Sequence, residues 1–195
     1  MKYKILILVF LINACSNKEY ISDRRLFDIL HTNFEKYSQT KEEKFLTIAF
    51  DSLKKNKKFN QGIFPKSSGQ WIIPILFNLK KYKKLEELLQ NDKNLNNYYK
   101  TNTIKLVKYL RLKNKNKEKA KIYMKESVKM INDSLLKFPN DSLKYFDLFF
   151  VKRILYGKEI ALKQIDSMES KNKFSSRFSK MLKRDILEFP IEMFD

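Results

Sequence analysis

The sequence predicts an all-α protein of stacked antiparallel helical hairpins. Apolar residues recur at helical spacing in one segment after another, and the sustained period-two alternation of a strand is missing. Glycine, proline or lysine- and asparagine-rich stretches separate these segments. We expect seven to nine helices, arranged either as a repeat-like stack or as an irregular helical bundle.

The first predicted unit is a helix pair over residues 22–58. Asp23 to Tyr37 places apolar residues on one helical face, with Ser22 or Asp23 as the N-cap. Thr40 to Glu43 has the sequence of a capping box and predicts the start of a second helix. This helix runs into the lysine-rich segment Lys54 to Lys58, which we expect to be a solvated C-terminal end.

Residues 59–70 form the longest stretch without a helical pattern. The stretch contains two of the three glycines and a proline, so we expect it to be irregular. Its apolar residues Phe59, Ile63 and Phe64 are expected to pack back onto the core.

Residues 71–170 are predicted to contain three helical hairpins, followed by a capping helix over 175–189 that Pro190 ends. In the first hairpin, Pro74 is tolerable only near the first turn of its helix. Leu143 to Tyr156 is apolar nearly all round and should be buried. The paired segments are 71–79 with 85–89, 98–112 with 118–138, and 143–156 with 159–168.

Alignment of the second helices sets Leu85, Ala120 and Ala161 in equivalent places, separated by 35 and 41 residues. The segment Leu155 to Leu162 resembles the turn between paired helices of tetratricopeptide repeats, and Phe138 to Asp141 resembles the closing proline of that family. The resemblance implies a repeat-like stack in which a small residue lets the paired helices approach. A generic helical bundle remains the alternative.

The N-terminus begins with two lysines around Tyr3 and an apolar run from Ile5 to Ile12, which is too short to span a bilayer. Ile12-Asn13-Ala14-Cys15 then resembles the lipobox of bacterial lipoproteins, although Asn13 departs from the small residue common there. The resemblance implies a signal peptide over 1–14, cleavage before Cys15, and diacylglycerol on the Cys15 thiol. The alternatives are a plain signal peptide with an incidental cysteine, or a signal anchor.

With this resemblance the chain divides into the signal peptide, a lipidated tether over 15–21 and a single helical domain over 22–195. Ser16 follows the cysteine, which by resemblance to enterobacterial lipoproteins favours the outer membrane if the source is Gram-negative.

The composition argues against catalysis. Cys15 is the only cysteine and His31 the only histidine, so a disulfide, a thiolate or two-histidine metal site, and a histidine-based triad cannot be assembled within one chain. The adjacent carboxylates Glu42 with Glu43, and Glu86 with Glu87, diverge on a helix. We therefore expect no enzyme activity, no cofactor, no metal and no small-molecule substrate, and we expect His31 to be a packing residue.

The formal charge of +19 calls for an anionic partner or another explanation. Only six of the 41 basic residues are arginine, which argues against nucleic acid. The abundance of lysine, asparagine and isoleucine is also typical of an AT-rich genome. Five lysines at four-residue intervals form a candidate docking surface for an acidic partner, with a solvated helix face as the alternative: Lys113, Lys117, Lys121, Lys125 and Lys129.

We therefore expect a lipid-anchored cell-envelope protein that acts as a helical protein-interaction module. One alternative is an immunity-type lipoprotein that neutralises an acidic toxin domain. Another is a structural lipoprotein whose lysines bind a polyanion or the membrane surface.

Overall fold

The computed structural model describes residues 20–65 and 67–188 of the 195-residue chain. Within these ranges it contains ten α-helices and no strand, which confirms the all-α prediction. The count exceeds the expected nine because a four-residue helix interrupts the irregular stretch. In these same ranges, no helix is both long and apolar enough to cross a membrane.

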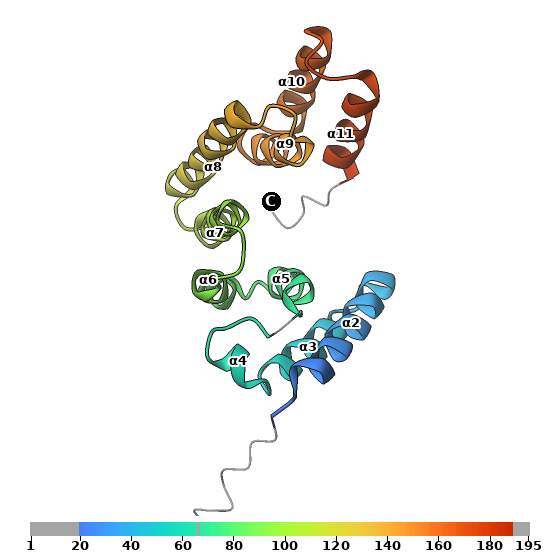
Figure 1. Ribbon diagram of the computed structural model, residues 1–195, viewed down its shortest axis with the longest axis vertical. Helices are drawn as coiled ribbons and strands as arrows, with labels where there is room; N and C mark the ends of the chain where they lie inside the picture. The colour runs from blue at the N-terminus through green and yellow to red at the C-terminus, as the bar shows by residue number, and fades with distance from the viewer. Residues whose placement is uncertain (1–19, 66, 189–195) are drawn as a thin grey trace, which may run out of the picture. The chain divides into compact units, whose positions relative to one another are not determined.

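The chain divides into two compact units, one up to Lys93 and the other from Asn94 (Figure 1). This boundary falls between the first and second predicted hairpins, inside the range 71–170, where the sequence showed no domain limit. Pro190, the predicted end of the last helix, and the lipobox lie outside the described residues.

In the first unit, α2 (Asp23–Thr40) and α3 (Glu43–Leu53) pack against each other and against α5 (Gly69–Asn78). The predicted cap is confirmed, because the Ser22 side chain accepts a hydrogen bond from the backbone N–H of Arg25. α6 (Tyr82–Asn91) packs against α5 and completes the first predicted hairpin. The core of the unit consists mainly of leucine and isoleucine side chains that are fully buried: Leu26, Leu30, Ala49, Leu53, Ile72, Ile75, Leu76, Leu85, Leu88 and Leu89.

The predicted capping box at Thr40 is wrong. Thr40 is the last residue of α2, and its hydroxyl donates to the carbonyl of Lys36. The N-cap of α3 is Glu42, which makes no capping hydrogen bond with its side chain. The reason is that α2 continues past Tyr37, and Lys41 then turns the chain with a φ of 59°.

The segment from Lys54 to Lys58 is not a uniformly solvated helix end, as the sequence predicted. Asn56 within it is 2% exposed, and its side chain donates to the carbonyl of Ile21 and to Asp23. Asn56 also caps α4 (Lys57–Asn60), which buries Phe59. Phe59 therefore packs as expected, whereas Ile63 is 46% exposed.

Pro74 is the sixth residue of α5 and lies in its second turn, beyond the first turn, where a proline is tolerated. Its carbonyl accepts from the side chain of Asn78, and the Asn78 oxygen in turn accepts from the Tyr37 hydroxyl at 2.9 Å. These two bonds connect the end of α5 to α2.

The second unit contains five helices, α7 (Asn97–Leu112), α8 (Lys117–Lys137), α9 (Ser142–Tyr156), α10 (Lys158–Ser170) and α11 (Ser176–Glu188). α9 is central, because it packs against α8, α10 and α11. This position explains the apolar character of α9 on nearly all sides. The prediction of burial holds for the middle of the helix, where Leu148, Phe149 and Val151 are buried, but not for its ends, since Leu143 is 64% and Tyr156 46% exposed.

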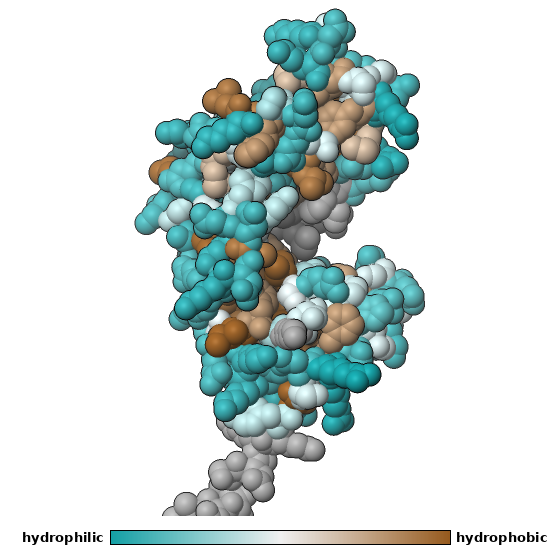
Figure 2. Space-filling model, in the orientation of Figure 1, coloured by the Kyte–Doolittle hydropathy of each residue, from teal (hydrophilic) through white to brown (hydrophobic). Residues whose placement is uncertain are grey.

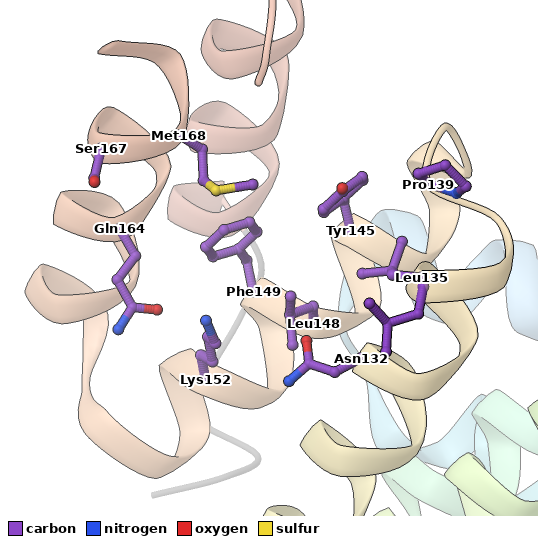
Figure 3. A pocket seen from close by; sticks show the side chains of 11 residues that line it. Asn132, Leu135, Pro139, Tyr145, Leu148, Phe149, Lys152, Gln164, Ser167 and Met168 are labelled. Atoms are coloured by element: carbon purple, nitrogen blue, oxygen red, sulfur yellow. The ribbon is translucent and has the colours of Figure 1, made fainter. Parts of the chain in front are cut away.

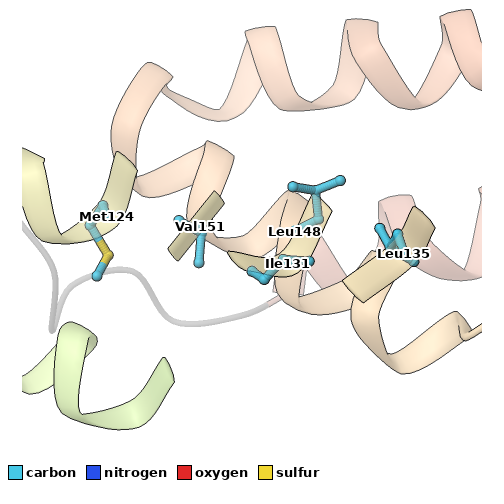
Figure 4. Close-up of a cluster of buried hydrophobic side chains, with 5 residues drawn as sticks. All are labelled: Met124, Ile131, Leu135, Leu148 and Val151. Atoms are coloured by element: carbon cyan, nitrogen blue, oxygen red, sulfur yellow. The ribbon is translucent and has the colours of Figure 1, made fainter. Parts of the chain in front are cut away.

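Two clusters of buried side chains lie on either side of α9. Figure 4 shows the first, between α8 and α9, which consists of Met124, Ile131, Leu135, Leu148 and Val151. The second lies between α9, α10 and α11 and consists of Phe149, Ile165, Phe174, Leu182 and Ile186. Phe149 thus belongs to the packing of α9 on its α10 and α11 side.

The turns of the second unit follow the sequence signals. Asp141 caps α9 by accepting from the N–H of Lys144, and Ser175 accepts from the N–H of Phe178 at the start of α11. Gly157 separates α9 from α10 with φ 90° and ψ 165°, a conformation open almost only to glycine.

The tetratricopeptide resemblance implied a different role for Gly157, namely close approach of the paired helices. A Cβ added at Gly157 would meet no atom within 4 Å, so the backbone conformation and not crowding requires glycine here. The aligned residues Leu85, Ala120 and Ala161 are all fully buried, as equivalent positions of second helices would be.

Candidate functional site

The candidate site is a groove of about 580 Å³ in the second unit, bounded by α8, α9 and α10 (Figure 3). α9 provides the floor, and α8 and α10 provide the two rims. The residues that line it are Asn132, Leu135, Leu136, Pro139, Tyr145, Leu148, Phe149, Lys152, Gln164, Ser167 and Met168.

The floor is apolar because α9 presents Leu148 and Phe149 there, which are 5% and 1% exposed. Leu148 also packs in the cluster between α8 and α9, and Phe149 in the cluster beneath α10 and α11. Both side chains are fixed by packing, so the floor of the groove is rigid.

Lys152 is the one basic residue that lines the groove. Its Nζ lies 5.3 Å from the centroid of the Phe149 ring, in a cation–π contact. Burial lowers the pKa of the Lys152 ammonium group below its ordinary value. Among residues 20–65 and 67–188, no carboxylate lies within ion-pair distance of this Nζ.

Gln164 faces Lys152 from α10, at the same end of the groove (Figure 3). Its Oε1 is buried and has no hydrogen-bond partner among the described residues. A buried acceptor without a donor is unfavourable. The groove thus holds one unpaired cation and one unpaired acceptor.

Two carboxylates of α10, those of Asp166 and Glu169, are engaged outside the groove. Asp166 is two residues from Gln164, about 200° around an ideal helix. Asp166 and Glu169 both pair with Lys183 of α11. The face of α10 that carries Gln164 instead continues at helical spacing with Ile160, Ser167 and Lys171, none of which is acidic.

Four of the five lysines predicted as a docking surface lie on α8, and Lys113 is the C-cap of α7. Lys125 and Asn132 are seven residues apart, about 20° short of two helical turns, and so are Lys129 and Leu136. Lys125 and Lys129 therefore share the face that forms the α8 rim of the groove.

Two of the carboxylates near these lysines are engaged with lysines of this chain. Glu118 pairs with Lys121 at 3.0 Å, and this contact is the main cause of the lowered pKa of the Glu118 carboxyl. Glu126 pairs with Lys105 of α7. Lys125 and Lys129 remain exposed at the edge of the groove.

Exposed apolar side chains extend the groove at its α8 to α9 corner. Leu136, Phe138 and Leu143 are 83%, 58% and 64% exposed, and Lys144 Nζ lies 4.4 Å from the centroid of the Phe138 ring. Elsewhere, most of the face seen in Figure 2 is hydrophilic, and apolar side chains appear in small separate patches.

Lys152 and Gln164 were missed by the sequence analysis. The available signal was a single lysine within the run Leu148 to Leu155, which is otherwise apolar apart from the adjacent Arg153. Nothing in the sequence indicated that α10 would turn its carboxylates to the other side.

The residues examined for catalysis are dispersed. His31 packs 4.8 Å from the Trp71 ring, centroid to centroid, and its Nε2 lies 3.1 Å from Glu35. Glu86 is buried whereas Glu87 pairs with Lys84 at the surface, so these neighbours do diverge. In the part of the chain that the structure describes, no group of three His, Cys, Asp or Glu residues could hold a metal ion.

Comparison of the chain with protein-family models, with curated proteins and with solved structures finds no match.

Proposed function

We propose that this protein is a lipid-anchored cell-envelope protein that binds another protein through the groove of its second unit. The observation that carries the proposal is the groove itself, in which a rigid apolar floor lies beside an unpaired, half-buried lysine. Leaving a charged group partly desolvated without a partner is unfavourable for folding, and such groups concentrate at functional sites.

The groove favours an acidic protein over a simple polyanion. The lysines of α8 supply long-range attraction for negative charge. The exposed leucines and phenylalanine of the adjoining corner match apolar side chains, which sulfated or phosphorylated polymers lack. Lys125 and Lys129 are expected to act as rim charges that speed association.

Site-specific photocrosslinking tests the docking surface. A photoreactive amino acid at Leu136, on the exposed rim, should crosslink one discrete acidic protein in cells, and the added substitution Lys152→Glu should abolish the product. The matched control is the same amino acid at Ile48 on α3, which is 49% exposed in the other unit. Equal crosslinking from both positions, or none from Leu136, would contradict the proposed surface.

The anchor is tested separately by the intact mass of protein purified from its native membrane. We expect a chain that begins at Cys15 and carries acyl chains, and a Cys15→Ala variant that is neither processed nor lipidated. An unmodified Cys15 would refute the lipid anchor and leave the docking surface to be judged on its own test.

A further inference from the structure

We propose that the groove recognises a peptide segment that presents a side-chain carboxylate to Lys152 and an N–H donor to Gln164, beside an apolar side chain over Leu148 and Phe149. This inference rests on the proposed function and specifies the chemistry of the partner.

The first step is the charge at Lys152. The ammonium group lies over the Phe149 ring and has no carboxylate partner in the described parts of the chain. Neither rim of the groove contributes an acidic residue to its lining. A carboxylate brought by the partner would therefore meet attraction without competition from the carboxylates of the described residues.

The second step is the acceptor at Gln164. Sulfate or the carboxylate of a fatty acid could pair with Lys152, but neither carries a donor for the buried Oε1 of Gln164. A peptide offers both groups, because each residue other than proline has a backbone N–H. The combination of an unpaired cation and an unpaired acceptor at one end of the groove selects a peptide.

The third step is the apolar floor. Tyr145, Leu148 and Met168 continue the lining away from Lys152, toward Pro139 (Figure 3). A bulky apolar side chain next to the carboxylate would be covered by this floor. The expected motif is therefore an aspartate or glutamate followed or preceded by large apolar residues.

The test is selection from a phage-displayed library of random dodecapeptides on detergent-solubilised full-length protein. We expect the selected peptides to share an acidic residue adjacent to large apolar residues. In the best peptide, replacing this acid by its amide should weaken binding about tenfold, an effect in the range of half-buried charge pairs.

Variants of the protein test whether Lys152 determines the preference for an acidic residue in the selected peptides. Lys152→Glu should exchange the selected acid for lysine or arginine, and Lys152→Met should remove the charge preference while apolar residues are still selected. Gln164→Leu should weaken binding of the original peptide without changing its acid preference. Lys183→Glu, on the other side of α10, is the matched control and should select the original motif.

Two results would overturn the inference. One is a motif that is the same for the original protein and for Lys152→Glu, and the other is the absence of any enriched peptide on the original protein. Crosslinking from Leu136 together with either result would keep the docking surface and reject only the carboxylate chemistry.

Discussion

Two lysines on opposite sides of α10 have opposite electrostatic environments. Lys183 of α11 pairs with Asp166 and Glu169, and these partners raise the pKa of its ammonium group. Lys152 of α9 lies in the groove against Phe149, and burial without a partner lowers its pKa. α10 thus supplies two carboxylate partners to Lys183 and none to Lys152.

The difference shows that, in the second unit, the lysine that stabilises helix packing and the lysine proposed to bind a partner lie on different sides of α10. On the α10 and α11 side, Lys183 is paired with two carboxylates and the buried side chains of the second cluster pack within the unit. The groove side retains an ammonium group without a carboxylate partner and an amide oxygen without a donor among the described residues. Phe149 lies between the two sides and belongs to both.

The largest expected effect is that of Phe149→Ala. Removal of this ring would open a cavity beneath α10 and α11 and delete part of the groove floor, so we expect a loss of about 3–5 kcal/mol in the free energy of unfolding. Chemical denaturation followed by circular dichroism measures it. The control is Phe138→Ala, which should change stability by less than about 0.5 kcal/mol because its ring is 58% exposed. Similar losses of stability in both variants would contradict the role of Phe149 in packing α9 against α10 and α11.

The two lysines should respond to neutral substitution with opposite signs. Lys152→Met should stabilise the protein by about 1 kcal/mol at pH 7, because it replaces a desolvated charge by an apolar side chain. Lys183→Met should destabilise it by a few tenths of a kcal/mol, the usual value of an ion pair near the surface. Thermal unfolding of both variants beside the original protein checks the signs, and a loss of stability in Lys152→Met would mean that its charge is already paired.

The pH dependence sharpens this comparison. The folded pKa of Lys152 is lowered, so its unfavourable contribution is present at neutral pH and disappears as pH rises through the folded value toward about 10.4, the ordinary value for lysine. The folded pKa of Lys183 is raised, so its contribution is favourable below the ordinary value and is lost as pH rises past the folded one. At high pH the gain in unfolding free energy of Lys152→Met and the loss in Lys183→Met, each relative to the original protein, should therefore both become smaller.

The smallest expected effect concerns Asp147, also on α9, whose carboxylate accepts from the Tyr98 hydroxyl of α7 at 3.1 Å. Burial raises the pKa of Asp147, and the hydrogen bond from Tyr98 only partly opposes this. Stability of the original protein should thus fall as pH rises from about 4 through the raised value. Asp147→Asn should be more stable by less than about 1 kcal/mol at pH 7 and no different at pH 3. A less stable variant at pH 7 would show that the carboxylate is the better acceptor.

Local signals in the sequence were sufficient for the helices and most of their ends. Ser22, Asp141 and Gly157 act where they were expected, because a cap or a positive φ depends on a few neighbouring residues. The capping box failed at Thr40 for the same kind of reason, since two helices competed for one residue and the longer apolar pattern of α2 included it. The burial of Asn56 could not be predicted, because its partners Ile21 and Asp23 come from another part of the chain.

The sequence by itself determined that the chain is helical, where most of the helices lie, and that lysine dominates its charge, since all of these depend on composition or on residues a turn or two apart. Only the tertiary structure decided which lysines are paired. Lys152 and Lys183 differ because the packing of α11 against α10 pairs Lys183 with Asp166 and Glu169, whereas α9 presents Lys152 to the groove. The groove and its unmatched charge follow from that packing, which no local pattern encodes.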